Sequence, residues 1–133
     1  MPDSRIMEYV GVPFLLGGRD TKGCDCWGLA RLVLDKVYGK HLPSYDVVED
    51  LDPVEIASLV DTFVPLLPLS RVESPGEGDI VLMKYMGYCS HIGLAVGDGY
   101  VLHSDPLCRD LSKLDRMTSP RIAARMEGFY RVQ

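Results

Sequence analysis

The sequence has no long hydrophobic run and no concentration of positive charge. The longest nearly unbroken apolar segment, residues 63–69, holds only seven of the 133 residues and includes two prolines, whereas a membrane-spanning helix needs about 20 residues. The chain carries 14 basic and 19 acidic residues, a net charge of −5, and no stretch concentrates Lys and Arg. We therefore expect neither membrane insertion nor nucleic-acid binding.

The N-terminus also lacks the features of a signal peptide. Residues 1–5 contain a single basic residue and lead into Tyr9-Val10-Gly11-Val12-Pro13 without an apolar core segment. We expect synthesis in the cytosol without export by a signal peptide. In such a reducing compartment, the four cysteines at positions 24, 26, 89 and 108 do not imply disulfides. A reactive thiol, a metal ligand and a core filler remain possible roles for each.

The order of hydrophobic patterns predicts one α+β domain over residues 1–133. Apolar residues recur at helical spacing over 26–38, where Gly39 ends the pattern, and Asp52-Pro53 begins a shorter helix that ends at Pro65. After residue 75, short β-rich segments alternate with glycines. We expect strands at 79–84, 92–96, 100–103 and 128–132. Helices followed by strands indicate helices packed on an antiparallel sheet rather than alternating βαβ units.

Cys26 lies where a glycine-containing loop turns into the first predicted helix. Unpaired backbone N–H groups and the positive end of the helix dipole at this point lower a thiol pKa. The same N–H groups can bind the oxyanion that forms when a thiolate attacks a carbonyl. Cys26 is therefore a candidate nucleophile, and the alternative is a buried cysteine that fills the core under the helix.

A cysteine nucleophile needs a base, and the chain has only three histidines. His41 follows the predicted helix end and is interpreted as structural or solvated. His91 and His103 lie on neighbouring strands joined by residues 97–99. With a three-residue loop, opposed residues have numbers that add to 196, so Gly93 lies opposite His103 and His91 is its diagonal neighbour on the same face. This register lets the two imidazoles meet, with His91 as base and His103 orienting it.

Short motifs along the chain resemble the NlpC family of papain-like cell-wall cysteine peptidases. The resemblance covers Tyr9 to Arg131. The matching motifs, in family order, are Tyr9-x-Gly11-x-Pro13-Phe14, Gly17-Gly18, Asp25-Cys26-Trp27-Gly28-Leu29, Leu42-Pro43, Gly78-Asp79-Ile80-Val81, Ser90-His91-Ile92-Gly93-Leu94 and Leu102-His103.

The resemblance implies a papain-like fold in which a helix that begins with Cys26 packs on an antiparallel sheet. It also implies Cys26 as nucleophile, His91 as general base and His103 as orienting residue, without a cofactor or metal. Family members typically hydrolyse the bond between D-glutamate and meso-diaminopimelate in peptidoglycan stem peptides. Residues expected around the oxyanion and the substrate are Phe14, Asp25, Trp27 and Ser90.

Three features are most similar to the branch found in phage, prophage and phage-like particle tails. They are the Trp after the cysteine, the loop Gly17-Gly18-Arg19-Asp20 and the ending Glu127-Gly128-Phe129-Tyr130-Arg131. This branch implies a place in a virion tail or phage-like particle, with tail-tip proteins as partners. Two positions depart from the family pattern, because Trp27 replaces the common Ser and Phe14 replaces a Tyr whose hydroxyl can face the site. The missing hydroxyl implies a slower enzyme.

Two alternatives stay open at this point. The first is a catalytically silent tail protein on the same scaffold, since a fold does not imply its activity. The second is a zinc site built from Cys24-x-Cys26, Cys89-x-His91 and His103-x4-Cys108, although none of these pairs has the C-x2-C spacing typical of zinc sites. Asp105 is the reserve candidate for the orienting residue.

Overall fold

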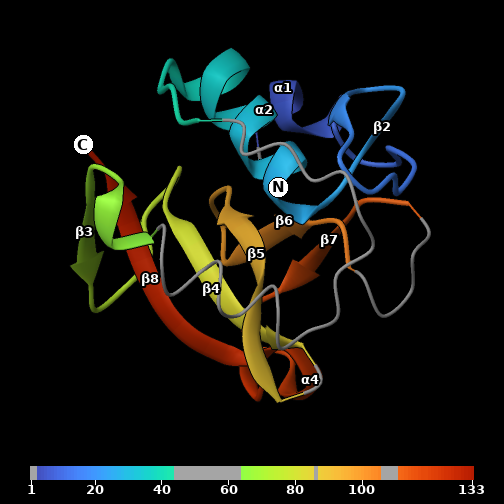
Figure 1. Ribbon diagram of the computed structural model, residues 1–133. Helices are drawn as coiled ribbons and strands as arrows, with labels where there is room; N and C mark the ends of the chain where they lie inside the picture. Colours follow the sequence, from blue (N-terminus) through green and yellow to red (C-terminus); the bar gives the residue numbers. More distant parts are fainter. Residues whose placement is uncertain (1–2, 44–63, 86, 106–110) are drawn as a thin grey trace.

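The structure is a computed structural model that describes residues 3–43, 64–85, 87–105 and 111–133. Helices α1 and α2 lie on one side of a strongly bent sheet, and α4 lies at its opposite end (Figure 1). In chain order, the elements are α1 (Ser4–Met7), β1 (Arg19–Asp20), β2 (Gly23–Cys24), α2 (Cys26–Tyr38), the 3-10 helix η1 (Val64–Leu66), β3 (Leu69–Val72), β4 (Ile80–Tyr85), β5 (Tyr88–Ala95), β6 (Tyr100–His103), β7 (Lys113–Arg116), α4 (Pro120–Ala123) and β8 (Met126–Val132).

The main sheet has six strands in the order β3-β8-β4-β5-β6-β7, and every neighbouring pair is antiparallel. The predicted α+β class with an antiparallel sheet is therefore confirmed. The four predicted strands correspond to β4, β5, β6 and β8, whereas β3 and β7 were not predicted from the sequence. The helix predicted to begin at Asp52-Pro53 and end at Pro65 lies outside the described residues up to residue 63, and Pro65 lies in the 3-10 helix η1.

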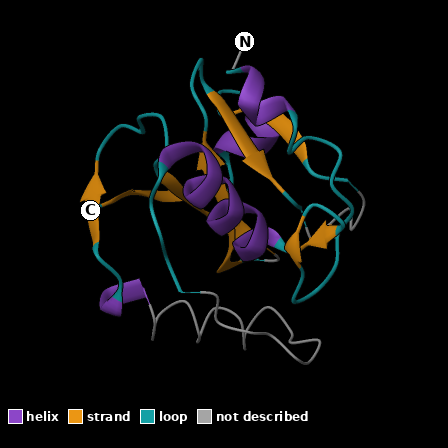
Figure 2. Ribbon diagram, turned by 90° about the horizontal axis from the view of Figure 1, so that it is seen from above, coloured by secondary structure: helices purple, strands orange, loops and turns teal. Residues whose placement is uncertain are grey.

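Helix α2 has the predicted bounds, and its two ends show why. The Asp25 side chain accepts a hydrogen bond from the backbone N–H of Gly28 at 2.8 Å, which caps the first turn. Gly39 adopts the left-handed conformation with φ 66°, and its N–H bonds to the carbonyl of Leu34. Seen from above, α2 crosses the sheet (Figure 2). The packing of α2 on the sheet therefore determines where Cys26, its first residue, lies.

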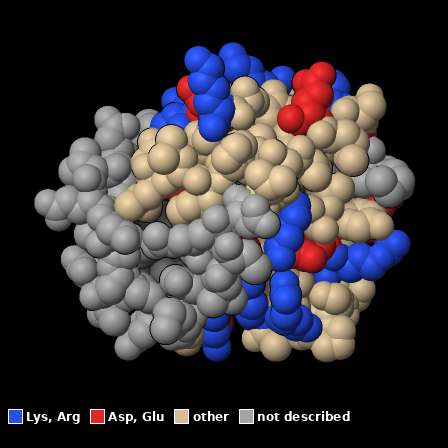
Figure 3. Space-filling model, turned by 90° about the vertical axis from the view of Figure 1, so that its right-hand side faces the viewer, with Lys and Arg blue, Asp and Glu red and all other residues tan. Residues whose placement is uncertain are grey.

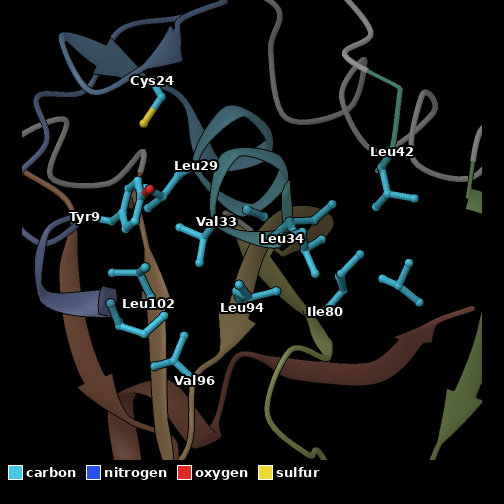
Figure 4. Packing of buried hydrophobic residues seen from close by; sticks show 14 of the residues in the cluster. Tyr9, Cys24, Leu29, Val33, Leu34, Leu42, Ile80, Leu94, Val96 and Leu102 are labelled. Atoms are coloured by element: carbon cyan, nitrogen blue, oxygen red, sulfur yellow. The ribbon is translucent and has the colours of Figure 1, made fainter. Parts of the chain in front are cut away.

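Two apolar clusters cover the two faces of the sheet. In the larger cluster, α2 residues such as Leu29 and Val33 pack against Ile80, Leu94 and Leu102 (Figure 4). The smaller cluster lies on the other face and includes Val81, Met83, Ala95, Val101 and Ile122 of α4. Residues on β5 therefore alternate between the α2 face and the α4 face, as strand geometry requires.

The β5–β6 hairpin has the register predicted from the histidine spacing. Leu94 pairs with Leu102 and Ala95 with Val101, so that paired numbers add to 196. The loop residues 97–99 all have positive φ values, which glycine adopts without strain and which Asp98 adopts at 55°. The three-residue loop therefore places His91, Gly93 and His103 on one face of the sheet.

Basic and acidic side chains alternate on the described surface. On the face in Figure 3, Lys and Arg side chains lie in several separate groups with Asp and Glu between them.

No helix in the described part of the chain is long and apolar enough to cross a membrane.

Candidate active site

Asp25 joins the loop before α2 to the first turn of the helix. Besides capping Gly28, its buried carboxylate accepts hydrogen bonds from the N–H of Gly17 at 2.9 Å and from Arg19 Nη1 at 2.9 Å. Gly28 must be a glycine, because a Cβ there would lie 2.1 Å from the carbonyl oxygen of Gly18. These contacts hold Cys26, the first residue of the helix, in a single position.

The sulfur of Cys26 lies against the open end of the β5–β6 ladder. The N–H of Val96 donates to the carbonyl of Tyr100 on β6, and in an antiparallel ladder the N–H groups that point toward one neighbouring strand recur at every second residue. The N–H of Ile92 therefore points toward β6, where pairing stops at Leu94 and Leu102. That N–H donates instead to the Cys26 sulfur, as does the N–H of Trp27. The sulfur thus lies one residue along the strand from His91.

The environment of the Cys26 sulfur makes it a weaker acid than the sequence predicted. Burial and the neighbouring Asp25 carboxylate raise the pKa of the Cys26 thiol to about 12, and the N–H groups of Ile92 and Trp27 only partly oppose this. The prediction of an unusually acidic thiol is therefore wrong for the free protein. Cys26 begins as a neutral thiol and needs a base to remove its proton.

His91 and His103 form a hydrogen-bonded pair that extends to a third residue. Nε2 of His91 lies 2.7 Å from Nδ1 of His103, and the ring centroids are 5.0 Å apart. Nε2 of His103 lies 2.7 Å from Oδ2 of Asp115. Both histidines are fully buried. Within the described residues, Nδ1 of His91 has no hydrogen-bond partner, so the pair presents one free ring nitrogen.

Gly93 provides the space in which the two rings meet. A Cβ at this position would lie 2.6 Å from Val101 Cγ2 and 3.3 Å from His103 Cβ. We expect Gly93→Ala to lower the free energy of unfolding by about 1–3 kcal/mol and to separate the two imidazole rings. Urea unfolding measures the first effect, and NMR of the histidine rings measures the second. In the control Gly76→Ala, the new Cβ would lie 3.0 Å from Arg131 Nη2 and 3.5 Å from Asp79 Oδ2, both side-chain ends. Equal effects of both changes would contradict the packing argument.

Both histidines are held neutral by their surroundings. Burial lowers the pKa of His91 well below 6.5, and the neighbouring His103 lowers it further. Burial also lowers the pKa of His103, although its hydrogen bond to Asp115 opposes the shift. A neutral His91 can accept a proton from a thiol, which is the protonation state that a general base requires.

Neutral buried histidines predict a loss of stability in mild acid. Below about pH 6.5 the unfolded chain binds protons at both imidazoles while the folded protein does not, so the free energy of unfolding falls as pH decreases, by up to about 1.4 kcal/mol per pH unit for each histidine. Urea unfolding between pH 7.5 and 5 measures the slope. His103→Gln should reduce it, and an unchanged slope in that variant would exclude His103 as a source.

The other predicted site residues are placed as follows. Phe14 forms a β-bridge with Cys24, two residues before Cys26, and its side chain is half-buried. Trp27 Nε1 donates to the carbonyl of Pro43 at 3.0 Å. The side chain of Ser90 lies outside the described residues. Asp105, the reserve orienting candidate, forms an ion pair through both carboxylate oxygens with Arg125 at 2.8 and 3.2 Å.

His41 and Cys24 are not part of the arrangement of Cys26, His91 and His103. His41 is exposed and its Nδ1 lies 2.7 Å from Asp35 Oδ1, consistent with a solvated residue. Cys24 is fully buried within the larger apolar cluster, as a core filler is. In the described part of the chain, no three His, Cys, Asp or Glu residues are grouped to hold a metal ion. The side chain of Cys89 and all of Cys108 lie outside that part.

Asp115 is the residue of this arrangement that sequence reasoning missed. His103 pairs with Lys113 across β6 and β7, so Asp115 is a diagonal neighbour of His103 on the same face. His91 has the same diagonal relation to His103 on the other side. The equal spacing of 91, 103 and 115 was a usable signal, but only once 113–116 was identified as a strand.

Comparison with known proteins identifies relatives of this chain. The model of the NlpC/P60 family matches residues 11–129. Protein P54 of Enterococcus faecium is 25% identical over 97 residues, which are 73% of this chain and 16% of that protein. The chain therefore spans about a sixth of the length of this relative.

Solved structures show the same fold. The NlpC/p60 domain of the peptidoglycan hydrolase SagA is similar with a TM-score of 0.62 at 20% identity, over 96% of this chain and 95% of that one. An NLP/P60 family protein from Staphylococcus aureus has a TM-score of 0.65 at 22% identity, over 95% of this chain and 38% of that one. NlpC1 from Trichomonas vaginalis has a TM-score of 0.64 at 17% identity, over 96% of this chain and 41% of that one. With the family model matching most of its length, this chain belongs to the NlpC/P60 family and has its papain-like fold.

Proposed function

We propose that this protein is a cysteine peptidase that hydrolyses amide bonds in the stem peptides of peptidoglycan. The observation that carries the proposal is the free Nδ1 of His91, which is a buried, neutral base. His91 lies on β5, and the N–H of the following residue, Ile92, binds the Cys26 sulfur. A protein without catalytic use for this nitrogen would leave a buried polar atom unpaired at a cost in stability.

In the proposed mechanism, three groups of this chain serve the steps of amide hydrolysis. His91 Nδ1 takes the proton of the Cys26 thiol as the sulfur attacks the carbonyl carbon. The N–H of Cys26, which has no helical carbonyl partner, can bind the oxyanion. His91 then gives the proton to the leaving amine, and a thioester joins the acyl fragment to Cys26. Attack of water on the thioester, with His91 again accepting a proton, releases the acid and restores the thiol.

The two residues whose backbone N–H groups bind the Cys26 sulfur also line a pocket. Trp27 and Ile92, whose N–H groups bind the sulfur, also line a small apolar pocket with Leu82 and Tyr130. Its volume of about 10 Å³ admits no group larger than a water molecule or a methyl.

The bond proposed for cleavage joins D-glutamate to meso-diaminopimelate or a similar dibasic residue. Support comes from the family membership and from SagA, a peptidoglycan hydrolase with the same fold. We propose further that the protein opens the wall locally as part of a phage or phage-like tail, alongside tail-tip proteins. The motifs around Trp27 and at residues 127–131 support this placement.

Digestion of purified cell walls tests the proposal. The protein is incubated with sacculi that contain either diaminopimelate or lysine at the third stem position, and mass spectrometry identifies the released muropeptides. We expect new D-glutamate carboxyl ends in diaminopimelate-type walls with the protein and none with Cys26→Ser. Absence of any new end in both wall types with folded protein would favour the catalytically silent scaffold instead.

A further inference from the structure

We infer that Asp115 is a positioning residue that sets the protonated nitrogen of His91 from two hydrogen bonds away. The inference rests on the proposed function, because it concerns the base of that reaction. It adds a fourth member, supplied by β7, to the arrangement of Cys26, His91 and His103.

The geometry is a single row across three adjacent strands. His91 lies on β5, His103 on β6 and Asp115 on β7, and their side chains meet on one face at 2.7 Å for each of the two contacts. Both histidines are fully buried, whereas the Asp115 side chain is 25% exposed. The row therefore begins at a partly solvated carboxylate and ends at a dry ring nitrogen.

The direction of each hydrogen bond follows from the carboxylate. An ionised carboxylate can only accept, so Nε2 of His103 must carry a proton and donate it to Asp115. A neutral imidazole has one N–H, which leaves Nδ1 of His103 as an acceptor. Nε2 of His91 must then donate to it, and Nδ1 of His91 keeps its lone pair. Nδ1 of His91 is the nitrogen that has no hydrogen-bond partner among the described residues. With its proton on Nε2, His91 is in the tautomer that can accept a proton from a thiol at Nδ1.

A reversed row would disable the base. If the group at position 115 donated to Nε2 of His103, each ring would carry its proton at Nδ1 instead, and Nδ1 of His91 would be blocked. Other charges lie near the row but do not replace the carboxylate. Lys113 Nζ lies 3.6 Å from Asp115 Oδ2 and can only donate, while Asp105 is paired with Arg125.

The tautomers can be observed directly by NMR of protein with ¹⁵N-labelled histidine, recorded at a pH at which the buried imidazoles are neutral. In the wild type we expect both buried histidines to be protonated at Nε2 only. In Asp115→Asn, whose amide can donate, we expect an N–H signal at Nδ1 of both rings. Exposed His41 serves as an internal standard, because its environment does not include Asp115.

Two further variants keep the test decisive. Asp115→Leu has the same branched shape and no acceptor, so His103 Nε2 should lose its fixed proton in this variant even if the amide of Asn turns its oxygen inward. Glu127→Gln removes an exposed carboxylate that is paired with Lys84 and should change neither spectrum nor rate. Retention of the wild-type tautomers in both Asp115→Asn and Asp115→Leu would overturn the inference.

Kinetics on a stem peptide supply the second readout. Asp115→Asn should lower kcat by on the order of tenfold to hundredfold, with little change in KM, because orienting groups act on the transition state. An unchanged kcat alongside shifted tautomers would also contradict the positioning role. Because the NMR result does not require turnover, an inactive wild type with the expected tautomers would count against the proposed function and not against the role of Asp115.

Discussion

Replacing Cys26 with alanine is expected to abolish hydrolysis of stem peptides. Removal of a nucleophile of this kind typically lowers kcat by about 10⁴-fold or more, because the remaining backbone N–H groups cannot form the acyl intermediate. The fold should persist, since the change only leaves two backbone N–H groups without an acceptor, at about 1–3 kcal/mol for each group. Hydrolysis rates and thermal unfolding of the same preparation measure both effects.

Cys26→Ser is the matched control for this change. Its hydroxyl can accept the same two N–H bonds but is a poor nucleophile, so it should be inactive with a stability close to that of the wild type. Rates within tenfold of the wild type in Cys26→Ala would mean that another group performs the attack. Inactivity with a large loss of stability in Cys26→Ser would mean that the residue is structural.

His91→Gln is expected to lower kcat more than His103→Gln. In the proposed mechanism, the free Nδ1 of His91 takes the thiol proton, so loss of His91 should lower kcat by about 10³-fold or more. His103 acts through His91 in that mechanism, so its loss should lower kcat by about ten to a hundredfold. Rates on a synthetic stem peptide give the order, with circular dichroism to establish that each variant is folded.

Packing complicates the comparison of these two variants. Both rings are fully buried, and each substitution leaves a neighbour without its hydrogen bond. Glutamine keeps an amide that can donate and accept within a similar volume, which limits the loss of stability. A larger effect of His103→Gln in folded protein would reverse the roles of base and orienting residue.

The features predicted correctly from the sequence depend on local signals. Helix α2 begins at an Asp cap and ends at Gly39, and both signals act within a few residues. The His91–His103 pairing follows from a short hairpin, in which loop length and side-chain alternation determine which residues meet. Such contacts need no knowledge of the rest of the fold.

The features missed depend on contacts between distant segments. Strand β7 has a weak pattern of β-forming residues, Lys-Leu-Asp-Arg, and becomes a strand only by pairing with β6. Without β7 there was no way to place Asp115 beside His103. The prediction that Cys26 has a lowered thiol pKa was wrong for a similar reason. The place of Cys26 at the start of a helix could be predicted from the sequence, whereas the burial of its sulfur against β5 could not.

Trapping of the acyl intermediate tests the central claim most directly. A defined stem peptide is hydrolysed by the wild-type protein in the presence of increasing hydroxylamine, and the products are identified by mass spectrometry. A thioester on Cys26 would react with hydroxylamine as well as with water. We therefore expect the hydroxamate of the acyl fragment to increase with hydroxylamine concentration, and to be absent with Cys26→Ala. Release of the amine fragment with only the free acid as partner, at every hydroxylamine concentration, would contradict attack by Cys26.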